Sequence, residues 1–251
     1  MTTPFDLSGQ TAIVTGANTG IGQAIALSLA AAGADIAAVG RTPAQETVEK
    51  VRALGRQAQI VSADLSSIEP VQRVVDETLE KLGRLDILVN NAGIIRRADS
   101  VDFTEEDWDA VIDTNLKTTF FLCQAAGRHM LAQGAGKIIN IASLLSFQGG
   151  IRVPSYTASK SGVAGLTKLL ANEWAARGVN VNAIAPGYIA TNNTAALQAD
   201  ETRNRQIQER IPAGRWGDPD DIGGAAVFLA SSAADYIHGH TLAVDGGWLA
   251  R

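Results

Sequence analysis

The sequence predicts an α/β fold, a doubly wound parallel sheet of about seven strands with helices on both faces. Short runs rich in Val, Ile and Ala alternate with longer helical patterns along the 251 residues. These runs are apolar almost throughout, as expected for parallel strands that are covered on both faces. No linker, repeat or low-complexity segment interrupts the alternation, so we expect one domain over residues 1–251.

Each element is expected where its pattern is clearest. Strands coincide with uncharged β-branched and alanine runs, and helices with longer segments between them. Gly33 and Gly55 stop the first two helices, as glycine commonly does. In chain order we expect strand 11–16, helix 21–32, strand 35–40, helix 43–54, strand 59–64, a helix ending at 82, strand 86–90, helix 105–131, strand 137–143, helix 154–176 and strands 179–186 and 241–246.

One stretch, residues 187–216, breaks the pattern before the last helix. It is polar and holds a short helical segment near 200–210. Long irregular segments in compact domains commonly serve a binding site. We therefore expect this stretch to form a lid over a substrate.

Composition excludes several classes of protein. The net charge is -5 with acids and bases interspersed, which argues against nucleic acid as a partner. No apolar run is long enough to span a membrane, and the N-terminus has no signal pattern. Cys123 is the single cysteine, so no intrachain disulfide can form, as fits a reducing compartment. We expect a cytoplasmic protein with a small-molecule partner.

A glycine-rich segment, "VTGANTGIG", follows the first strand and opens the first helix. Gly16 allows a sharp turn, and Gly20 and Gly22 let the backbone and helix N-terminus approach a pyrophosphate. The spacing differs from G-x-G-x-x-G, and a plain glycine turn is the alternative. Three glycines between a first strand and a first helix favour dinucleotide binding. The predicted residues of this loop are Gly16, Asn18, Thr19, Gly20 and Ile21.

The next two strand ends bear on the choice of cofactor. An acid at the end of the second strand binds the ribose of NAD, whereas an arginine suits the 2′-phosphate of NADP. Gly40 and Arg41 stand there, which favours NADP. The alternative is that Arg41 stacks on adenine or faces solvent. After the third strand, Asp64 beside Leu65 could bind the adenine amino group, or could cap the following helix.

The fourth strand ends in "LVNNAG", at the carboxyl edge where ligands of such sheets bind. We interpret Asn90 as a clasp between neighbouring strands. Asn91 belongs to the predicted cofactor site, and Ala92 and Gly93 leave room for the nicotinamide ribose.

The segment "PSYTASKSG" carries the predicted chemistry. On a helix, Tyr156 and Lys160 share one face, about 5–6 Å apart at Cβ. A nearby ammonium would lower the tyrosine pKa from its usual value near 10. Ser143, at the end of the strand "KIINIAS", could hold a substrate oxygen in line with the phenol. The three residues would form an acid/base relay for a carbonyl–alcohol pair. The alternative is one turn of an ordinary helix.

Other chemistries find little support in the sequence. The three histidines do not combine with Cys123 into a ligand set, so no metal is expected. No serine lies in a G-x-S-x-G elbow, which argues against Ser-His-Asp hydrolysis. The segment "HGHTLAVDGGW" is expected to close the sheet and form a subunit contact.

The ordered motifs "TGANTGIG", "NNAG", "YTASK" and "PG" resemble those of the classical short-chain dehydrogenase/reductase family, over residues 7–247. The resemblance implies a Rossmann-type fold, an NAD(P) cofactor and a homotetramer. It implies that Ser143, Tyr156 and Lys160 are catalytic, with Lys160 also binding the nicotinamide ribose. Asn115, in "DTNLK", matches the residue that holds a water in the proton relay. Further cofactor contacts are implied for Tyr156, Pro186, Gly187, Ile189 and Thr191.

Longer stretches, including "NIASLLSFQGGIRVPSYTASKSGV" and "VDGGWLAR", are similar to family members that act on deoxy-hexonate sugar acids in uronate breakdown. That resemblance implies a secondary alcohol–ketone interconversion and NAD as the usual cofactor, which Arg41 does not favour. The alternatives are a 3-oxoacyl-thioester reductase, another small-polyol dehydrogenase and a non-catalytic dinucleotide sensor.

An acidic sugar needs an arginine for its carboxylate. Arg96, Arg97, Arg152 and Arg215 all fall near the expected mouth. We expect Arg152 to be the anchor because the loop between Ser143 and Tyr156 places it closest, although each arginine could instead be a surface or subunit-contact residue. The remaining predicted substrate contacts are Arg97, Gln148, Tyr188, Asn192 and Asn193.

Overall fold

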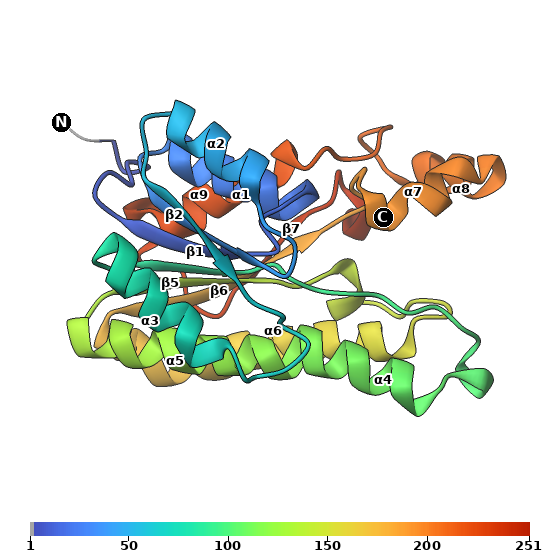
Figure 1. The fold of residues 1–251 in the computed structure, drawn as a ribbon. Helices are drawn as coiled ribbons and strands as arrows, with labels where there is room; N and C mark the ends of the chain where they lie inside the picture. The colour runs from blue at the N-terminus through green and yellow to red at the C-terminus, as the bar shows by residue number, and fades with distance from the viewer. Residues whose placement is uncertain (1–2) are drawn as a thin grey trace.

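The computed structural model describes residues 3–251, and a seven-stranded sheet runs through its centre (Figure 1). Every strand pair is parallel, and the order is β3-β2-β1-β4-β5-β6-β7. The predicted fold class is confirmed. The strands are β1 (Thr11–Thr15), β2 (Asp35–Gly40), β3 (Ala58–Ser62), β4 (Ile87–Asn90), β5 (Gly136–Ile141), β6 (Val179–Pro186) and β7 (Thr241–Val244).

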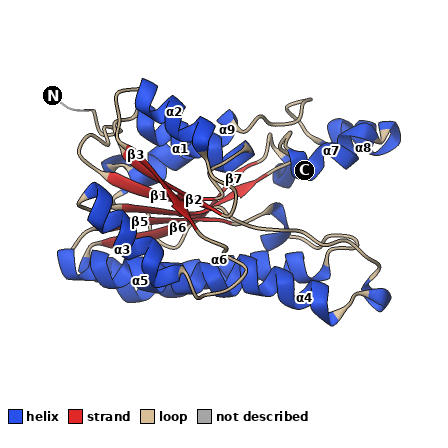
Figure 2. Ribbon diagram, in the orientation of Figure 1, coloured by secondary structure: helices blue, strands red, loops and turns tan. Residues whose placement is uncertain are grey.

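Helices cover the two faces of the sheet (Figure 2). One layer contains α1 (Gly20–Ala31), α2 (Gln45–Ala53) and α9 (Asp220–Ala230). The other contains α3 (Val71–Leu82), α5 (Thr118–Gln133) and α6 (Pro154–Trp174), with α4 (Glu105–Ile112) leading into α5. Strand order reverses between β1 and β4, and the carboxyl ends on the two sides of this point leave a crevice for a ligand.

The core explains the continuous apolar runs. In β1, Ala12 and Val14 pack with the α1 layer, whereas Ile13 between them packs with the α3 layer. All three are fully buried. Because successive residues of a strand face opposite sides, a sheet covered twice requires apolar side chains at every position.

The structure departs from the predicted helix 105–131 in one place. A π-helical turn, Asp113–Lys117, joins α4 to α5. It contains Asn115, and π turns inside helices are frequent at functional sites. Nothing in the residue types of "DTNLK" announces this turn.

Two short helices lie beyond the carboxyl ends of the strands, at the right of Figure 1. These are α7 (Ala195–Ala199) and α8 (Glu201–Arg210). The second confirms the short helix expected near 200–210. Among the described residues no helix is long and apolar enough to cross a bilayer.

Candidate active site

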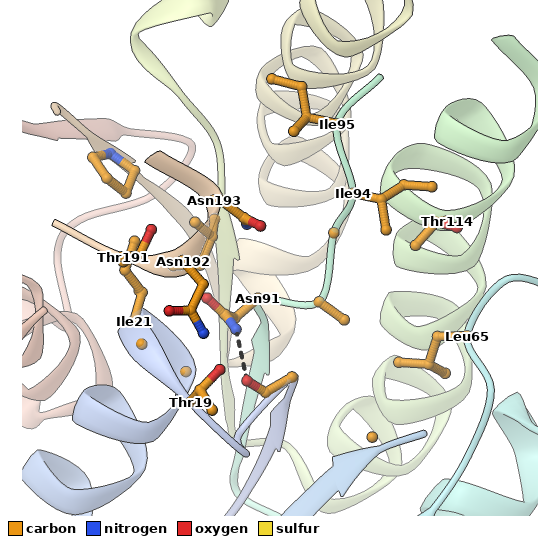
Figure 3. A pocket seen from close by; sticks show the side chains of 18 of the residues that line it. Thr19, Ile21, Leu65, Asn91, Ile94, Ile95, Thr114, Thr191, Asn192 and Asn193 are labelled. Atoms are coloured by element: carbon orange, nitrogen blue, oxygen red, sulfur yellow. Dashed lines mark hydrogen bonds between the residues drawn. The ribbon is translucent and has the colours of Figure 1, made fainter. Parts of the chain in front are cut away.

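A cleft of about 1110 Å³ opens along the carboxyl edge of the sheet. Loops after β1 to β6 line it, so residues far apart in sequence meet there (Figure 3). The structure brings together in it most of the predicted site: Gly16, Asn18, Thr19, Gly20, Ile21, Arg41, Asp64, Leu65, Asn91, Ala92, Gly93, Arg97, Ser143, Tyr156, Lys160, Pro186, Gly187, Ile189, Thr191 and Asn192.

The glycine loop is shaped for a close ligand. Gly16 and Gly20 have backbone φ angles of 65° and 56°, which residues other than glycine rarely adopt. A Cβ at Gly22 would overlap the Gly16 carbonyl and the Asn91 amide. The Asn91 Nδ2 donates to the carbonyls of Thr15 (2.9 Å) and Gly16 (3.3 Å), and Figure 3 shows this amide directed at the loop. The end of β4 thus holds the loop in place.

The N-terminus of α1 faces this loop. Thr19 precedes the helix with extended backbone and makes no side-chain cap bond. The first amides of α1 are therefore available to an anion, and the helix dipole favours one there. These features fit the pyrophosphate of a dinucleotide.

At the far end of the cleft, Arg41 reaches into solvent with its side chain 80% exposed. One guanidinium nitrogen lies 3.9 Å from the Asp64 carboxylate. The Ser66 amide donates to Asp64 Oδ1 at 3.0 Å, and hydrogen bonding by Ser66 lowers the pKa of Asp64. Because α3 begins only at Val71, with Pro70 at its N-cap, the alternative that Asp64 or Ser66 caps it is wrong.

At the opposite end of the cleft, Lys160 is a buried residue of the lining. Its Nζ donates to the Ile141 carbonyl at 2.5 Å and lies 5.7 Å from the centre of the Tyr156 ring. Burial lowers the pKa of Lys160 to about 8. The Leu145 amide donates to Ser143 Oγ at 3.2 Å, which fixes the serine after β5.

The Tyr156 phenol differs from the expectation. Burial is the largest influence and raises its pKa, while Ser143 and then Arg97 act in the opposite direction. The lowered pKa predicted from the Tyr–Lys pair is wrong in this structure. The Lys160 amine is bonded to the Ile141 carbonyl, and the desolvation that acts on the phenol also weakens the ammonium.

Asn115 lies beneath the cleft rather than in its lining, and is 1% exposed. Its Oδ1 accepts from the Ile94 amide (2.8 Å) and its Nδ2 donates to the Ile94 carbonyl (2.9 Å). A longer contact of 3.4 Å reaches Ser159 Oγ, next to Lys160. Asn115 therefore fastens the chain after "NNAG" to α6. Its predicted water-holding role stays a prediction.

Asn90 is the clasp that was expected. Its Nδ2 donates to Asn140 Oδ1 on the neighbouring strand at 2.9 Å. Asn140 in turn donates to Thr167 Oγ1 of α6 at 3.0 Å. This buried chain of hydrogen bonds links β4, β5 and the helix that carries Tyr156.

The four arginines near the mouth divide sharply. Three pair with carboxylates: Arg96 with Asp107 (3.1 Å), Arg152 with Asp99 (3.1 Å) and Arg215 with Asp221 (2.7 Å). Arg97 has no carboxylate partner among residues 3–251, lines the cleft, and donates only a 3.4 Å bond to the Asn193 carbonyl.

The preference for Arg152 as anchor is therefore not supported. Arg152 lies outside the cleft lining, held by Asp99 and by a backbone φ of 64°. Sequence distance from Ser143 did not reveal that the loop carries Arg152 away from the cleft.

Two other predicted substrate contacts also lie outside the lining. Gln148 Oε1 accepts from Trp248 Nε1 at 3.3 Å. Tyr188 packs against Trp216 and Trp248, with ring centres 5.4 and 4.6 Å away. The cleft does include Asn193, as expected. It also includes Ile94, Ile95, Thr114 and Thr194, which were not assigned to the site. The polar run "TNNT" pointed to Thr194, and the others carry no sequence signal.

Comparison with known proteins decides the family. A family profile described as enoyl-(acyl carrier protein) reductase matches residues 16–249. Over 248 residues the chain is 60% identical to 2-dehydro-3-deoxy-D-gluconate 5-dehydrogenase of Escherichia coli strain K12, spanning 98% of each chain. The chain belongs to the short-chain dehydrogenase/reductase family. The family and the oxidoreductase class expected from the motifs are confirmed.

Two solved structures of this family share the fold almost completely. One, from Agrobacterium tumefaciens, is provisionally described as a 2-deoxy-d-gluconate 3-dehydrogenase with bound NADP; it is 62% identical, covers 99% of each chain and has a TM-score of 0.93. The other is a gluconate 5-dehydrogenase from Burkholderia cenocepacia in complex with NADP and tartrate. It is 41% identical, with a TM-score of 0.94 over 99% of this chain and 98% of that one.

Proposed function

We propose that this chain is a 2-dehydro-3-deoxy-D-gluconate 5-dehydrogenase, interconverting the C5 alcohol of that sugar acid and the corresponding ketone with NADP(H). In a degradative route it would reduce 3-deoxy-D-glycero-2,5-hexodiulosonate. One observation carries the proposal. Ser143, Tyr156 and Lys160 meet at one end of a dinucleotide-sized cleft, in a chain 60% identical to an enzyme of that name.

The residues of the cleft fit NADP. The glycine loop and the free amides of α1 suit the pyrophosphate, and Arg41 suits the 2′-phosphate because no acid ends β2. Both solved relatives described above hold NADP. When bound, the nicotinamide supplies the hydride acceptor or donor. These points favour NADP over the NAD that the sugar-acid subgroup usually implies.

The protein's own residues manage the proton. In oxidation, the C–H bond breaks as hydride leaves the carbon, and Tyr156 as phenolate accepts the hydroxyl proton. In reduction, the Tyr156 phenol gives that proton to the ketone oxygen. Ser143 orients the oxygen and favours the phenolate, and Lys160, whose Nζ lies 5.7 Å from the ring centre, would bind the nicotinamide ribose. Asn115 keeps the nicotinamide-side loop and α6 in register.

Arg97 is the residue we assign to the substrate carboxylate. Of the three arginines that line the cleft, Arg96 pairs with Asp107 and Arg41 lies at the adenine end, whereas Arg97 has no carboxylate partner among residues 3–251 and acts on the Tyr156 pKa. A free guanidinium can take a carboxylate through two hydrogen bonds. Asn192 lies in the same lining and can meet sugar hydroxyls.

The decisive experiment is turnover of purified protein with 2-dehydro-3-deoxy-D-gluconate, using NADP and NAD in parallel. We expect turnover with preference for NADP, and Tyr156→Phe should lose activity by about 10²–10⁴-fold while still binding NADP. Turnover of a 3-oxoacyl thioester in place of the sugar acid would overturn the substrate. A wild type that binds NADP and turns over nothing would favour a sensor.

We also propose that the chain works as a cytoplasmic homotetramer in uronate catabolism, with residues 187–216 as the substrate lid. The support for assembly is the edge strand β7, which pairs only with β6 within residues 3–251 and so offers a free edge. Light scattering should give four times the 26.2 kDa chain mass. A monomer mass would contradict the assembly without affecting the chemistry.

A further inference from the structure

The last residues of the chain fold back onto the substrate end of the cleft. After β7, the Asp245 carboxylate accepts from the amides of Gly247 (2.8 Å) and Leu249 (2.9 Å), which closes a tight turn. Gly246 and Gly247 have φ of 64° and 90°. This turn directs Trp248 inward, where it is only 4% exposed.

The turn is fitted to the end of the lid. A Cβ on Gly246 would lie 2.9 Å from Ile211 Cγ2, and the Gly246 carbonyl accepts from the Ala213 amide at 2.9 Å. Arg251 Nη1 donates to the Glu209 carbonyl at 3.0 Å. The chain terminus therefore touches the end of α8 and the residues that follow it.

The Trp248 indole contacts three segments at once. On the lid, the Arg210 guanidinium lies 3.9 Å from the ring centre. On the catalytic loop, Gln148 Oε1 accepts from Nε1 at 3.3 Å. After β6, the Tyr188 ring lies 4.6 Å away. The same apolar cluster includes Leu144, Ile207 and Ile211.

Two of these segments border the reacting end. Leu144 directly follows Ser143, and Ser146 Oγ donates to the Lys160 carbonyl at 2.7 Å. Tyr188 directly follows Gly187 of the cleft lining. The glycine loop, Arg41 and Asp64 are not among the contacts of Trp248. The indole thus joins α8 to two segments at the substrate end and does not contact the cofactor half.

We propose that Trp248 is a positioning residue that ties the lid helix α8 to the loop carrying Ser143 and so sets affinity for the sugar acid. The proposal rests on the proposed function. Without the indole, α8 loses one of its attachments to the catalytic loop, and substrate binding must order the lid to a greater extent. The lost preorganisation should appear in KM for the sugar acid and not in NADP affinity.

The test compares Trp248→Ala with Trp174→Ala. Trp174, at the end of α6, packs against Gly127 of α5, away from the cleft. Its substitution therefore removes the same kind of side chain at a site distant from the substrate. We expect Trp248→Ala to raise KM for the sugar acid roughly tenfold or more with the Kd of NADP unchanged. Trp174→Ala should lower Tm and leave KM alone. Trp248→Phe, which keeps the stacking on Arg210 and Tyr188, should restore most of the affinity.

Three results would overturn the proposal. KM could stay at the wild-type value in Trp248→Ala, Kd for NADP could rise in parallel with KM, or Trp174→Ala could raise KM equally. If Trp248→Ala does not fold, Arg210→Gln decides, because it removes the cation that lies over the indole. A raised KM in Arg210→Gln supports the proposal, and a wild-type KM in that variant refutes it. A wild type inactive on the sugar acid would instead refute the proposed function.

Discussion

Single residues decide what the cleft recognises, and the arginines show how. Four arginines stand near the mouth in sequence, yet three are neutralised by neighbouring carboxylates. Sequence spacing selected Arg152, which Asp99 holds outside the cleft. Partners contributed by other loops cannot be read from the local sequence, so Arg97 could be proposed as the carboxylate anchor only from the folded chain.

The first prediction uses Arg97 and Arg152 as a matched pair. Arg97→Gln should raise KM for the sugar acid about 10- to 100-fold, because a charge-assisted hydrogen bond contributes about 1.5–3 kcal/mol. Arg152→Gln should leave it within twofold, since its exposed ion pair with Asp99 contributes little. Steady-state kinetics with sugar acid and with a neutral polyol separates charge recognition from general damage. Equal effects of the two variants would refute the assignment.

The second prediction concerns pH and the Tyr156 phenol. Burial raises its pKa, so the phenol is protonated at neutral pH and ready to act as an acid. Ketone reduction should therefore be insensitive to pH near neutrality and decline in alkaline solution as the phenol ionises. Alcohol oxidation should increase over the same alkaline range. Profiles of kcat/KM in both directions check this, and oxidation that is already maximal below neutral pH would contradict it.

Elements, rather than residues, create the cofactor site, and here the sequence was informative. A strand–glycine–helix succession fixes the turn, the helix N-terminus and the sheet edge together, so the loop from Gly16 to Ile21 could be predicted in full. The π turn around Asn115 could not, because its extra residue reflects packing between α4, α5 and α6 rather than local preference. The same holds for Trp248, whose hydrogen-bond partner Gln148 lies 100 residues away in the catalytic loop.

The third prediction tests the close approach of β1 and α1. Gly22→Ala places a Cβ against the Gly16 carbonyl and the Asn91 amide, so the loop must shift. We expect the Kd of NADP to rise at least about tenfold, because the loop's backbone faces the pyrophosphate. Gly165→Ala in α6 is the control: nothing lies within 4 Å of its new Cβ, and removing a helical glycine should stabilise by about 0.5–1 kcal/mol. Fluorescence titration with NADPH measures the Kd of both variants, and unchanged affinity in Gly22→Ala would refute the argument.

At the scale of the whole molecule, the apolar layers on both faces of the sheet stabilise the fold, and a buried charge in the cleft lowers that stability. The fold class followed from strands apolar on both faces, a property of the entire sheet. Lys160 is a buried ionisable side chain in this largely apolar interior. It is 5% exposed, and burial lowers its pKa from 10.5 to about 8. Burying its charge disfavours the folded state wherever the amine is protonated.

The last prediction follows by linkage. Below about pH 8 both the folded and the unfolded chain bind the Lys160 proton, so the cost of burying the charge is fully present. Between about pH 8 and 10.5 the unfolded chain holds the proton and the folded chain does not, so stability from this residue rises with pH. The full change is about 3 kcal/mol for a shift of this size. The methionine of Lys160→Met cannot titrate. Between pH 7 and pH 10 the free energy of unfolding of the wild type should therefore rise, relative to that of Lys160→Met, by up to this amount. Urea unfolding of both proteins at the two pH values measures this difference, since the other groups titrate equally in both. If the unfolding free energies of the two proteins change with pH by the same amount, Lys160 keeps its ordinary pKa in the folded protein.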